Sequence, residues 1–343
     1  MTQRTILWKG GPDLSGNYNM EQYIYGIDHG NGNMKTRRTE FPCGVTKQQV
    51  KPSSLYAEDV IAYKGNYYVL NVNSSPYMTD KTKDENCFIL TLFAFAKEIK
   101  ARYLEADGIW DNFKGFVGKD VVLAAGLPPA HFEKNYAGFR KYFEDASRYG
   151  VEFTYNGKPF SFHIKDIKLY PQCYAAAMTQ MQEVIMKYRV VYFIDIGAGT
   201  TDLMGLVEGK PDRNVMMSRE IGISPMKDKI IDDVINDYAY TLDGQIIEDV
   251  LSSAKETVLD YEITEKIKRE AQEWATQIIN QMHSKVKDFR TAPTIFMGGG
   301  VKLLKPYLAN SNMFGRTFFI EDTKANAKGY EIIAEIESVG DSN

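Results

Sequence analysis

Two glycine-rich segments, each following an apolar run that ends in an aspartate, contain residue types suited to binding a phosphate chain. In the first, Asp28 precedes the loop Gly30-Asn31-Gly32-Asn33, and Lys35 follows the loop. The backbone N–H groups of such a turn can bind an anion, and a carboxylate at a strand end can hold a metal ion. A lysine ammonium beside them neutralises charge during phosphoryl transfer. This segment alone is not specific, because a glycine-rich turn also closes an ordinary hairpin.

The second segment is the more specific one. Asp195 is followed by Gly197, Ala198, Gly199, Thr200, Thr201 and Asp202, so small residues, two hydroxyls and two carboxylates share eight positions. We expect both segments to form a strand, a tight turn and a return strand, over 23–36 and 190–203, because β-branched and aromatic residues flank the glycines. One such unit in each half of the chain indicates two domains that bind the phosphates of a nucleotide between them.

A third glycine run and a glutamine complete the candidate chemistry. A strand over 294–297 leads to Gly298-Gly299-Gly300, and a helix begins at Val301. Consecutive glycines let a flat ligand such as a purine or a ribose approach the backbone, although they are also typical of a plain strand-to-helix turn. Gln172 follows Pro171 between the first two segments. Its amide could orient a water molecule at a terminal phosphate, but it cannot accept a proton as a general base at neutral pH.

Composition and charge restrict the class of protein. The chain has 343 residues, enough for two domains, and its net charge of −4 does not favour direct binding to nucleic acid phosphates. The three cysteines are far apart in the sequence, and none of the four histidines has a partner at metal-ligand spacing. The longest apolar run, residues 87–96, is too short to span a bilayer, and no export signal is evident. These features predict a soluble cytoplasmic protein with no membrane partner.

The spacing of apolar residues predicts the remaining elements. Helices are expected over 86–106, 130–148, 173–187, 224–240, 301–308 and 323–337, with two or three more within 244–289. Strands are expected over 121–127 and 318–320, and in a hairpin of 151–155 and 159–164. Apolar patches at 41–45, 59–63 and 67–72 predict a small β-rich subdomain at about 38–85. Residues 1–22 are expected to form a flexible extension, or an arm that docks on a neighbouring subunit through Trp8.

The order and spacing of these motifs resemble those of the actin-like ATPase superfamily, and within it the plasmid-segregation actins of the ParM/StbA family. The resemblance extends over about residues 23–337. It is carried by residues 26–35, the strand 122–127 with Pro128, residues 195–202, residues 297–300 and Asn326-Ala327-Lys328-Gly329. It implies an α/β, actin-like (ribonuclease H-like) fold with two domains around a central nucleotide cleft. Domain I would comprise residues 23–188 and 318–343, and domain II residues 189–317.

The resemblance also implies a role for each candidate residue. Asp28 and Asp195 would place Mg²⁺, mostly through water molecules. Lys35 and the amides of both loops would hold the β- and γ-phosphates; the loop residues are Gly30, Asn31, Gly32, Asn33, Gly197, Ala198, Gly199, Thr200 and Thr201. The nucleoside would contact Gly222, Lys268, Gly298, Gly299, Gly300 and Val301. Gln172 stands where segregation actins have a catalytic glutamate and actin a glutamine, so the catalytic set would be Gln172, Asp195 and Lys35.

The implied function is that of a nucleotide-dependent polymerising ATPase whose filaments segregate plasmid DNA. The implied cofactors are ATP, with GTP as the alternative, and Mg²⁺. The implied partners are further copies of the chain and a DNA-binding adaptor protein at a centromere-like site, with no direct contact to nucleic acid. The alternative is a small-molecule kinase of the same superfamily, which would need a carboxylate base beside a substrate hydroxyl. Asp166 is the candidate for that base.

Overall fold

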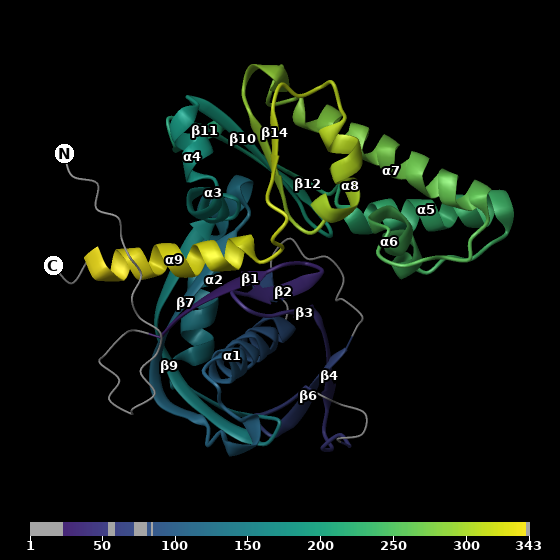
Figure 1. Ribbon diagram of the computed structural model, residues 1–343. Coiled ribbons are helices and arrows are strands. Elements are labelled where there is room, and N and C mark those ends of the chain that lie inside the picture. Colours follow the sequence, from purple (N-terminus) through teal and green to yellow (C-terminus); the bar gives the residue numbers. More distant parts are fainter. Residues whose placement is uncertain (1–22, 54–58, 72–80, 84, 341–343) are drawn as a thin grey trace.

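The described part of the chain forms two bodies, each built around its own β-sheet (Figure 1). The computed structural model describes residues 23–53, 59–71, 81–83 and 85–340. The predicted extension of residues 1–22, and parts of the predicted subdomain at 38–85, lie outside these ranges. Helices cover the faces of both sheets, so the predicted α/β architecture with two domains is confirmed.

The first body contains a nine-stranded sheet in the order β3-β2-β1-β7-β9-β8-β5-β6-β4. Its strands are β1 Tyr23–His29, β2 Asn33–Thr36, β3 Glu40–Pro42, β4 Gly44–Gln48, β5 Val60–Tyr63, β6 Asn66–Asn71, β7 Phe116–Leu127, β8 Val151–Tyr155 and β9 Lys158–Pro171. The strands formed by the patches of the expected small β-rich subdomain belong to this same sheet, which β5 joins by pairing with β8 through Ile61 and Ala62. Strand β9 is longer than expected, because it runs alongside β7 as far as Pro171.

The second body repeats this arrangement with five strands in the order β12-β11-β10-β13-β14. They are β10 Val190–Ile196, β11 Thr201–Val207, β12 Lys210–Arg219, β13 Thr294–Met297 and β14 Thr317–Phe319. In each body the central strand pairs antiparallel with the return strand of its glycine hairpin and parallel with the next strand, so β10, β11 and β13 correspond to β1, β2 and β7. The two predicted strand–turn–strand units are therefore confirmed. Each places an aspartate, Asp28 or Asp195, near the end of a central strand.

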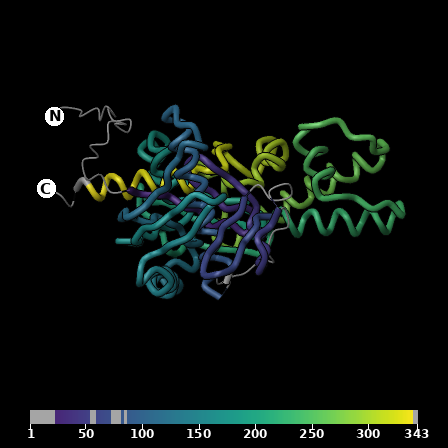
Figure 2. Tube along the Cα trace, turned by 90° about the horizontal axis from the view of Figure 1, so that it is seen from below, coloured from purple at the N-terminus to yellow at the C-terminus, as the bar shows by residue number. Residues whose placement is uncertain are grey.

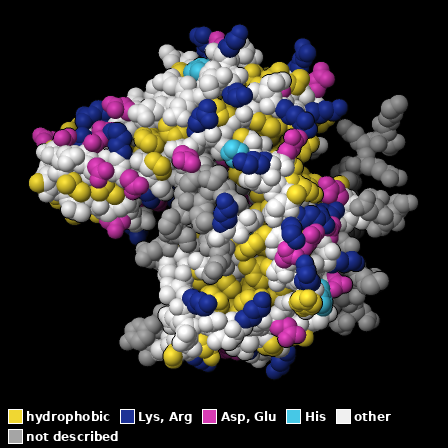
Figure 3. All heavy atoms as spheres, turned by 180° about the vertical axis from the view of Figure 1, so that it is seen from behind, with side chains coloured by type: hydrophobic (Ala, Val, Ile, Leu, Met, Phe, Trp, Pro, Cys, Tyr) yellow, Lys and Arg dark blue, Asp and Glu magenta, His cyan; other side chains and the backbone are white. Residues whose placement is uncertain are grey.

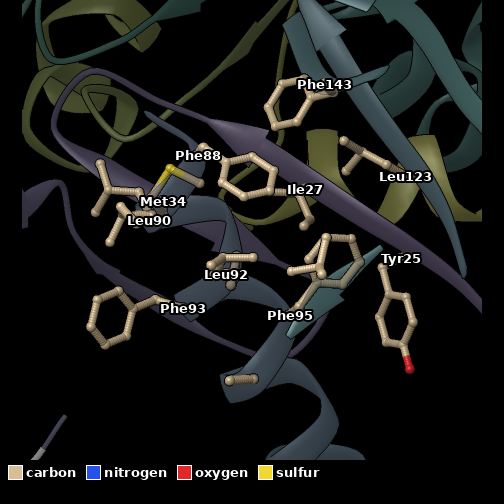
Figure 4. Packing of buried hydrophobic residues seen from close by; sticks show 14 of the residues in the cluster. Tyr25, Ile27, Met34, Phe88, Leu90, Leu92, Phe93, Phe95, Leu123 and Phe143 are labelled. Carbon is tan, nitrogen blue, oxygen red and sulfur yellow. The ribbon is translucent and has the colours of Figure 1, made fainter. Parts of the chain in front are cut away.

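Helix α1 (Glu85–Glu105) lies inside the curve of the first sheet and forms the centre of the first body (Figure 1). Its residues 92–96 have no exposed surface. A helix that is apolar on all sides is stable only where it is buried on all sides. Figure 4 shows Phe95 of this helix beside Tyr25 of strand β1, and the two ring centroids lie 5.3 Å apart. The helix thus supports the strand that carries the first glycine hairpin.

Helices α3 (Tyr174–Gln180), α4 (Gln182–Lys187) and α9 (Ala325–Gly340) form the layer between the two bodies (Figure 1). Helix α9 packs on the face of β1 and β7 that lies opposite α1, and α3 packs against α9. Residues of α3 and α4, including Ala177 and Ile185, also share a buried cluster with Phe193 of β10.

The packing near the predicted domain boundaries differs in two places from a simple division, and one predicted helix is divided. Residues 174–187, expected in domain I, pack on the second sheet as well as on α9. Strand β14 pairs with β13, so residues 317–319 belong to the second sheet, although the resemblance places residues from 318 onwards in domain I. The single helix expected over 173–187 is interrupted at Met181, which separates α3 from α4.

The remaining helices occupy positions close to those predicted. Helix α2 (Phe132–Ser147) packs on β9 in the first body. Helices α5 (Ile223–Tyr238), α6 (Gly244–Ser252), α7 (Tyr261–Met282) and α8 (Val301–Ala309) pack on the second sheet and on one another. Figure 2 shows α5, α6 and α7 projecting from the body as a lobe. Short 3₁₀ turns are η1 Lys81–Lys83, η2 Trp110–Asn112, η3 Pro129–His131 and η4 Phe289–Thr291. None of the described helices is both long and apolar enough to cross a membrane.

A buried carboxylate on α9 links the layer between the bodies to the first sheet. Glu331 is 1% exposed, and its side chain accepts a hydrogen bond from the backbone N–H of Gly26 at 3.1 Å. It also accepts hydrogen bonds from the guanidinium groups of Arg37 at 3.0 Å and Arg102 at 2.8 Å. Arg102 in turn pairs with Glu98 on α1 at 2.9 Å. One carboxylate therefore connects α9 to β1 and, through Arg102, to α1.

We expect Glu331→Ala to lower the free energy of unfolding by roughly 3 kcal/mol, because it leaves the partly buried Arg102 without one of its two carboxylates and the Gly26 N–H without an acceptor. Chemical denaturation followed by circular dichroism measures the change. Glu335→Ala on the same helix is the control, since Glu335 is more exposed and lies 3.9 Å from Arg37. We expect the control to lose less than about 1 kcal/mol. Equal losses in the two variants would contradict the role assigned to Glu331.

Candidate functional site

A cavity of about 810 Å³ lies between the two bodies and is lined by residues from both. Its volume is within the range of small-molecule sites, about 300–1,000 Å³. Most of the candidate residues line it: Asp28, Gly30, Asn31, Gly32, Asn33, Lys35, Gln172, Asp195, Gly197, Ala198, Thr200, Gly298, Gly299 and Gly300. The structure thus brings the three glycine turns, which are far apart in the sequence, to one place.

The two glycine hairpins contact each other at the floor of this cavity. A Cβ atom on Gly32 would lie 2.8 Å from the Cβ of Ala198, so a glycine is required for the first loop to approach the second this closely. Gly298 has a φ of +91°, and a Cβ atom there would collide with the carboxylate of Asp195. These close approaches let three backbone turns converge on a shared ligand.

Four residues that were expected to contact the nucleotide instead support the glycine turns. The hydroxyl of Thr201 donates to the carbonyl of Ile221 at 2.7 Å, and the N–H of Gly222 donates to the carbonyl of Gly199 at 3.2 Å. Val301 is fully buried at the start of α8. None of Gly199, Thr201, Gly222 and Val301 is among the residues that line the cavity. Thr201, Gly222 and Val301 are buried and Gly199 is half-buried, so these residues shape the turns and are not part of the cavity wall.

Three buried carboxylates lie at the cavity floor. Asp28, Asp195 and Asp202 are 4%, 8% and 4% exposed. Burial, together with the nearby charge of Asp28, raises the pKa of Asp195 to about 6. Burial also raises the pKa of Asp202 to about 7, and Asp202 Oδ1 has no hydrogen-bond partner among the described residues. The Lys35 Nζ atom lies 3.8 Å from Asp28 Oδ2. A positive charge placed among these carboxylates would offset the repulsion between them.

Gln172 follows the last residue of β9 and lies beside Asp28. Its Nε2 donates to Asp28 Oδ1 at 3.3 Å. The backbone turns sharply at the next residue, because Cys173 has φ +67° and ψ −45°, a strained conformation for a residue with a side chain. Asn326 holds this turn: it accepts a hydrogen bond from the N–H of Cys173 at 3.0 Å and donates to Asp195 at 3.1 Å. The turn therefore links the Gln172 amide to both aspartates.

Polar residues of α5, α6 and α8 line the part of the cavity beside the third glycine run. Lys227 Nζ lies 2.8 Å from Glu248 Oε1, and Lys302 is also part of the lining. No short motif marks these residues in the sequence, since each is a single polar position within an amphipathic helix. Lys268, which the resemblance places at the nucleoside, is instead exposed on α7, where it pairs with Glu265 at 2.8 Å. It is not among the cavity-lining residues, so the structure does not bring it together with the other candidate residues.

The residues of the floor fit a nucleotide bound with Mg²⁺. Within the described ranges, no group of three or more His, Cys, Asp or Glu side chains is placed to hold a metal ion. Mg²⁺ keeps several of its water molecules and takes its other ligands from one or two carboxylates and from phosphates, which two aspartates beside a phosphate site can satisfy. A Cβ atom on Gly299 would meet no atom within 4 Å, so the third glycine run has open space beside its backbone. A flat base or ribose requires such a space.

Two protein-family models match the chain, one for each body. Residues 26–174 match the N-terminal domain of actin-like proteins, and residues 193–310 match the C-terminal part of an MreB-like archaeal actin homologue. The two matches contain both glycine hairpins and the third glycine run. No match was found among curated protein sequences.

Solved structures of actin homologues have the same fold. The archaeal actin homologue Ta0583 in complex with ADP superposes with a TM-score of 0.68 at 19% identity, covering 92% of this chain and 100% of that one. The actin-like protein Alp7A gives a TM-score of 0.71 at 16% identity, covering 93% and 97%. A ParM from Clostridium botulinum, solved as a 15-stranded filament, gives 0.68 at 18% identity, covering 92% and 100%. These similarities extend over both bodies and establish the fold of the chain.

We expect Asp202→Asn to raise the free energy of unfolding of the nucleotide-free protein at about pH 8 by roughly 2–4 kcal/mol. The folded protein raises the pKa of Asp202 to about 7 from an ordinary value of 3.8, so ionisation of this group opposes folding. The wild type should therefore gain stability as the pH falls from about 8 towards 5, and the advantage of the variant should shrink over the same range. Denaturant titrations at several pH values measure both effects.

Asp228→Asn is the matched control, because Asp228 is exposed on α5. It should change stability by less than about 0.5 kcal/mol throughout this pH range. The assignment fails if Asp202→Asn is no more stable than the wild type at the alkaline end.

Proposed function

We propose that this chain, which has the fold of actin homologues, is a nucleotide-dependent actin-like ATPase whose filaments segregate plasmid DNA. The observation that carries this proposal is the contact between two glycine hairpins, one from each body, at a cavity that also contains Asp28, Asp195 and Gln172. A ligand bound there touches both bodies, so the presence of its phosphates affects how the bodies are held together. Nucleotide-dependent assembly requires a coupling of this kind.

Nucleotide binding is assigned to the three glycine turns and to Lys35. The N–H groups of both hairpins and the Lys35 ammonium would hold the β- and γ-phosphates. Although burial alone lowers it, the carboxylates around Lys35, Asp28 foremost, raise its pKa above the ordinary value, so the ammonium stays charged. Asp28 and Asp195 would position Mg²⁺, which when bound supplies positive charge to the transferred phosphoryl group. ATP is the proposed nucleotide, and the cytoplasm is the proposed location.

Hydrolysis is assigned to a water molecule oriented by Gln172. The amide NH₂ group donates to Asp28, which leaves the side-chain carbonyl oxygen to accept a hydrogen bond from water. A neutral amide takes no proton, so its contribution is to place the attacking oxygen in line with the terminal phosphoryl group. The strained turn at Cys173 and its hydrogen bond to Asn326 restrict the movement of this amide.

Self-assembly is proposed from the filaments of two proteins that have this fold. The ParM from Clostridium botulinum and the protein Alp12 were both solved as filaments, with TM-scores of 0.68 and 0.59 to this chain. DNA would be engaged through an adaptor protein at a centromere-like site. A net charge of −4 supports an indirect contact, and Figure 3 shows basic and acidic side chains interspersed on one face of the molecule.

The alternative function, a small-molecule kinase, has less support. Its candidate base, Asp166, pairs with Arg140 of α2 at 3.1 Å and is not among the residues that line the cavity. A base for a substrate hydroxyl must lie within hydrogen-bond reach of that hydroxyl in the cavity. Asp166 does not meet this requirement.

We expect the protein to sediment as polymer at tens of micromolar when ATP and Mg²⁺ are added, and to remain largely in the supernatant with ADP or without nucleotide. Triphosphate bound to both hairpins holds the bodies in one arrangement, and that arrangement is the one expected to assemble. High-speed sedimentation with electron microscopy of the pellet measures assembly. Absence of polymer across a range of salts and nucleotides would rule out the filament function.

Gln172→Ala should slow phosphate release about 10- to 100-fold, because water is no longer held in line with the terminal phosphoryl group. Nucleotide binding and assembly should persist. Gln180→Ala is the matched control, since Gln180 lies exposed at the end of α3 and should leave turnover unchanged. A steady-state phosphate assay combined with sedimentation separates the two steps. Unchanged turnover in Gln172→Ala would remove this residue from the mechanism.

A further inference from the structure

Lys81 is a cationic residue of the cavity that the contacts described above leave unused. It lies in η1, which precedes α1 in the sequence and packs against both α1 and α2. Its side chain lines the cavity together with residues of both bodies. Because two helices of the first body contact η1, we expect Lys81 to keep its position relative to that body.

Comparison of the cavity lysines separates Lys81 from the others. The lysines that line the cavity are Lys35, Lys81, Lys134, Lys227 and Lys302. Lys35 and Lys227 are each paired with a carboxylate, at 3.8 and 2.8 Å. Lys134 and Lys302 are exposed to solvent. Lys81 is half-buried, and no carboxylate of the described residues lies within ion-pair distance of its Nζ atom. The Lys81 ammonium is therefore partly removed from water and has no counter-ion among the described residues.

The surroundings of Lys81 place its ammonium at the phosphate end of the cavity. It interacts electrostatically with Cys43, whose thiol donates to the Gly30 carbonyl, and with Cys87 of α1. It also interacts with His29, Asp28 and Lys35, which belong to the first glycine hairpin. Gln172, the residue assigned to the attacking water, donates to the same Asp28. The polar residues beside the third glycine run, by contrast, come from α5, α6 and α8 of the second body. A cation at the first hairpin is therefore near the last phosphoryl group of a bound nucleotide and away from its base.

We propose that Lys81 is a second phosphate-binding lysine, whose ammonium contacts the terminal phosphoryl group of a bound nucleoside triphosphate. The inference rests on the proposed function, because it assumes that the cavity binds nucleotide. An ammonium removed from water without a counter-ion is unfavourable, and burial lowers the pKa of Lys81. A terminal phosphoryl group supplies both the missing negative charge and hydrogen-bond acceptors. Because this group is absent from a diphosphate, Lys81 makes the cavity discriminate between the two nucleotide states.

The test compares the binding of ADP and of a non-hydrolysable ATP analogue, each with Mg²⁺, by isothermal titration calorimetry. Lys81→Met should weaken binding of the triphosphate analogue by about 10- to 100-fold, the range of a hydrogen bond to a charged group. It should weaken ADP binding by less than about 3-fold, within the range of a remote change of charge. Lys81→Arg should recover most of the loss. Lys83→Met removes the same charge from an exposed position of the same turn and should change neither affinity.

A second measurement separates loss of the contact from loss of the fold. Because the Lys81 ammonium has no ion pair to lose among the described residues, Lys81→Met should be at least as stable as the wild type without nucleotide. Thermal unfolding without nucleotide checks this.

Equal weakening of both nucleotides, or no weakening of either, would overturn the assignment of Lys81 to the terminal phosphoryl group. A Lys81→Met protein that is clearly less stable than the wild type would show that the lysine is structural, which also overturns it. If the wild type binds neither ADP nor the analogue, the proposed nucleotide function itself fails. That outcome is distinct from a failure of Lys81 alone.

Discussion

Burial of like charge where two sheets meet is the constraint on which the rest of this structure depends. Asp28 and Asp195 occupy equivalent positions on the central strands of the two bodies, and Asp202 faces Asp195 on the return strand. A carboxylate removed from water loses favourable hydration, and the raised pKa values of Asp195 and Asp202 report that loss. Such a floor attracts cations, and also anions that carry a cation with them. The repulsion between these carboxylates also lowers the free energy of unfolding of the protein without a bound cation.

Contacts in the surrounding structure offset the unfavourable free energy of burying these carboxylates. Helix α1 fills the curve of the first sheet with apolar side chains and supports β1 directly below the first hairpin. Glu331 connects α9 to β1, and Asn326 at the start of α9 holds the strained turn after Gln172. Strained or unfavourable groups persist at functional sites where the neighbouring contacts determine their position. The C-terminal helix supplies both of these contacts, so it belongs to the site as much as to the fold.

Features that depend on neighbours in the sequence could be predicted, and features that depend on distant packing could not. The glycine hairpins and Asp28 could be predicted because the strand, the turn and the carboxylate are adjacent in the chain. Lys81 and Asn326 reach the cavity only through tertiary packing. Lys81 lies in no motif, and the motif that contains Asn326 supported the resemblance without indicating a role for that residue. The pairing of β5 with β8 is likewise non-local, and so is the pairing of β14 with β13, although a strand at 318–320 was expected. The exposure of Lys268, by contrast, could have been predicted from the sequence. Ile263, Ile267 and Ala271 mark the buried face of α7 at helical spacing and leave Lys268 on the exposed face.

The contact between α3 and α9 has a mechanical consequence. A Cβ atom on Gly329 would lie 2.5 Å from the carbonyl carbon of Ala175, so the backbones of the two helices touch. The neighbouring positions Ala176 and Ala177 are also small. Helices that meet through small side chains can slide along each other without repacking large ones, whereas interlocked side chains resist such a shift. Since α9 packs on the first sheet and α3 packs on the second, this smooth contact is a place where the two bodies can shear past one another.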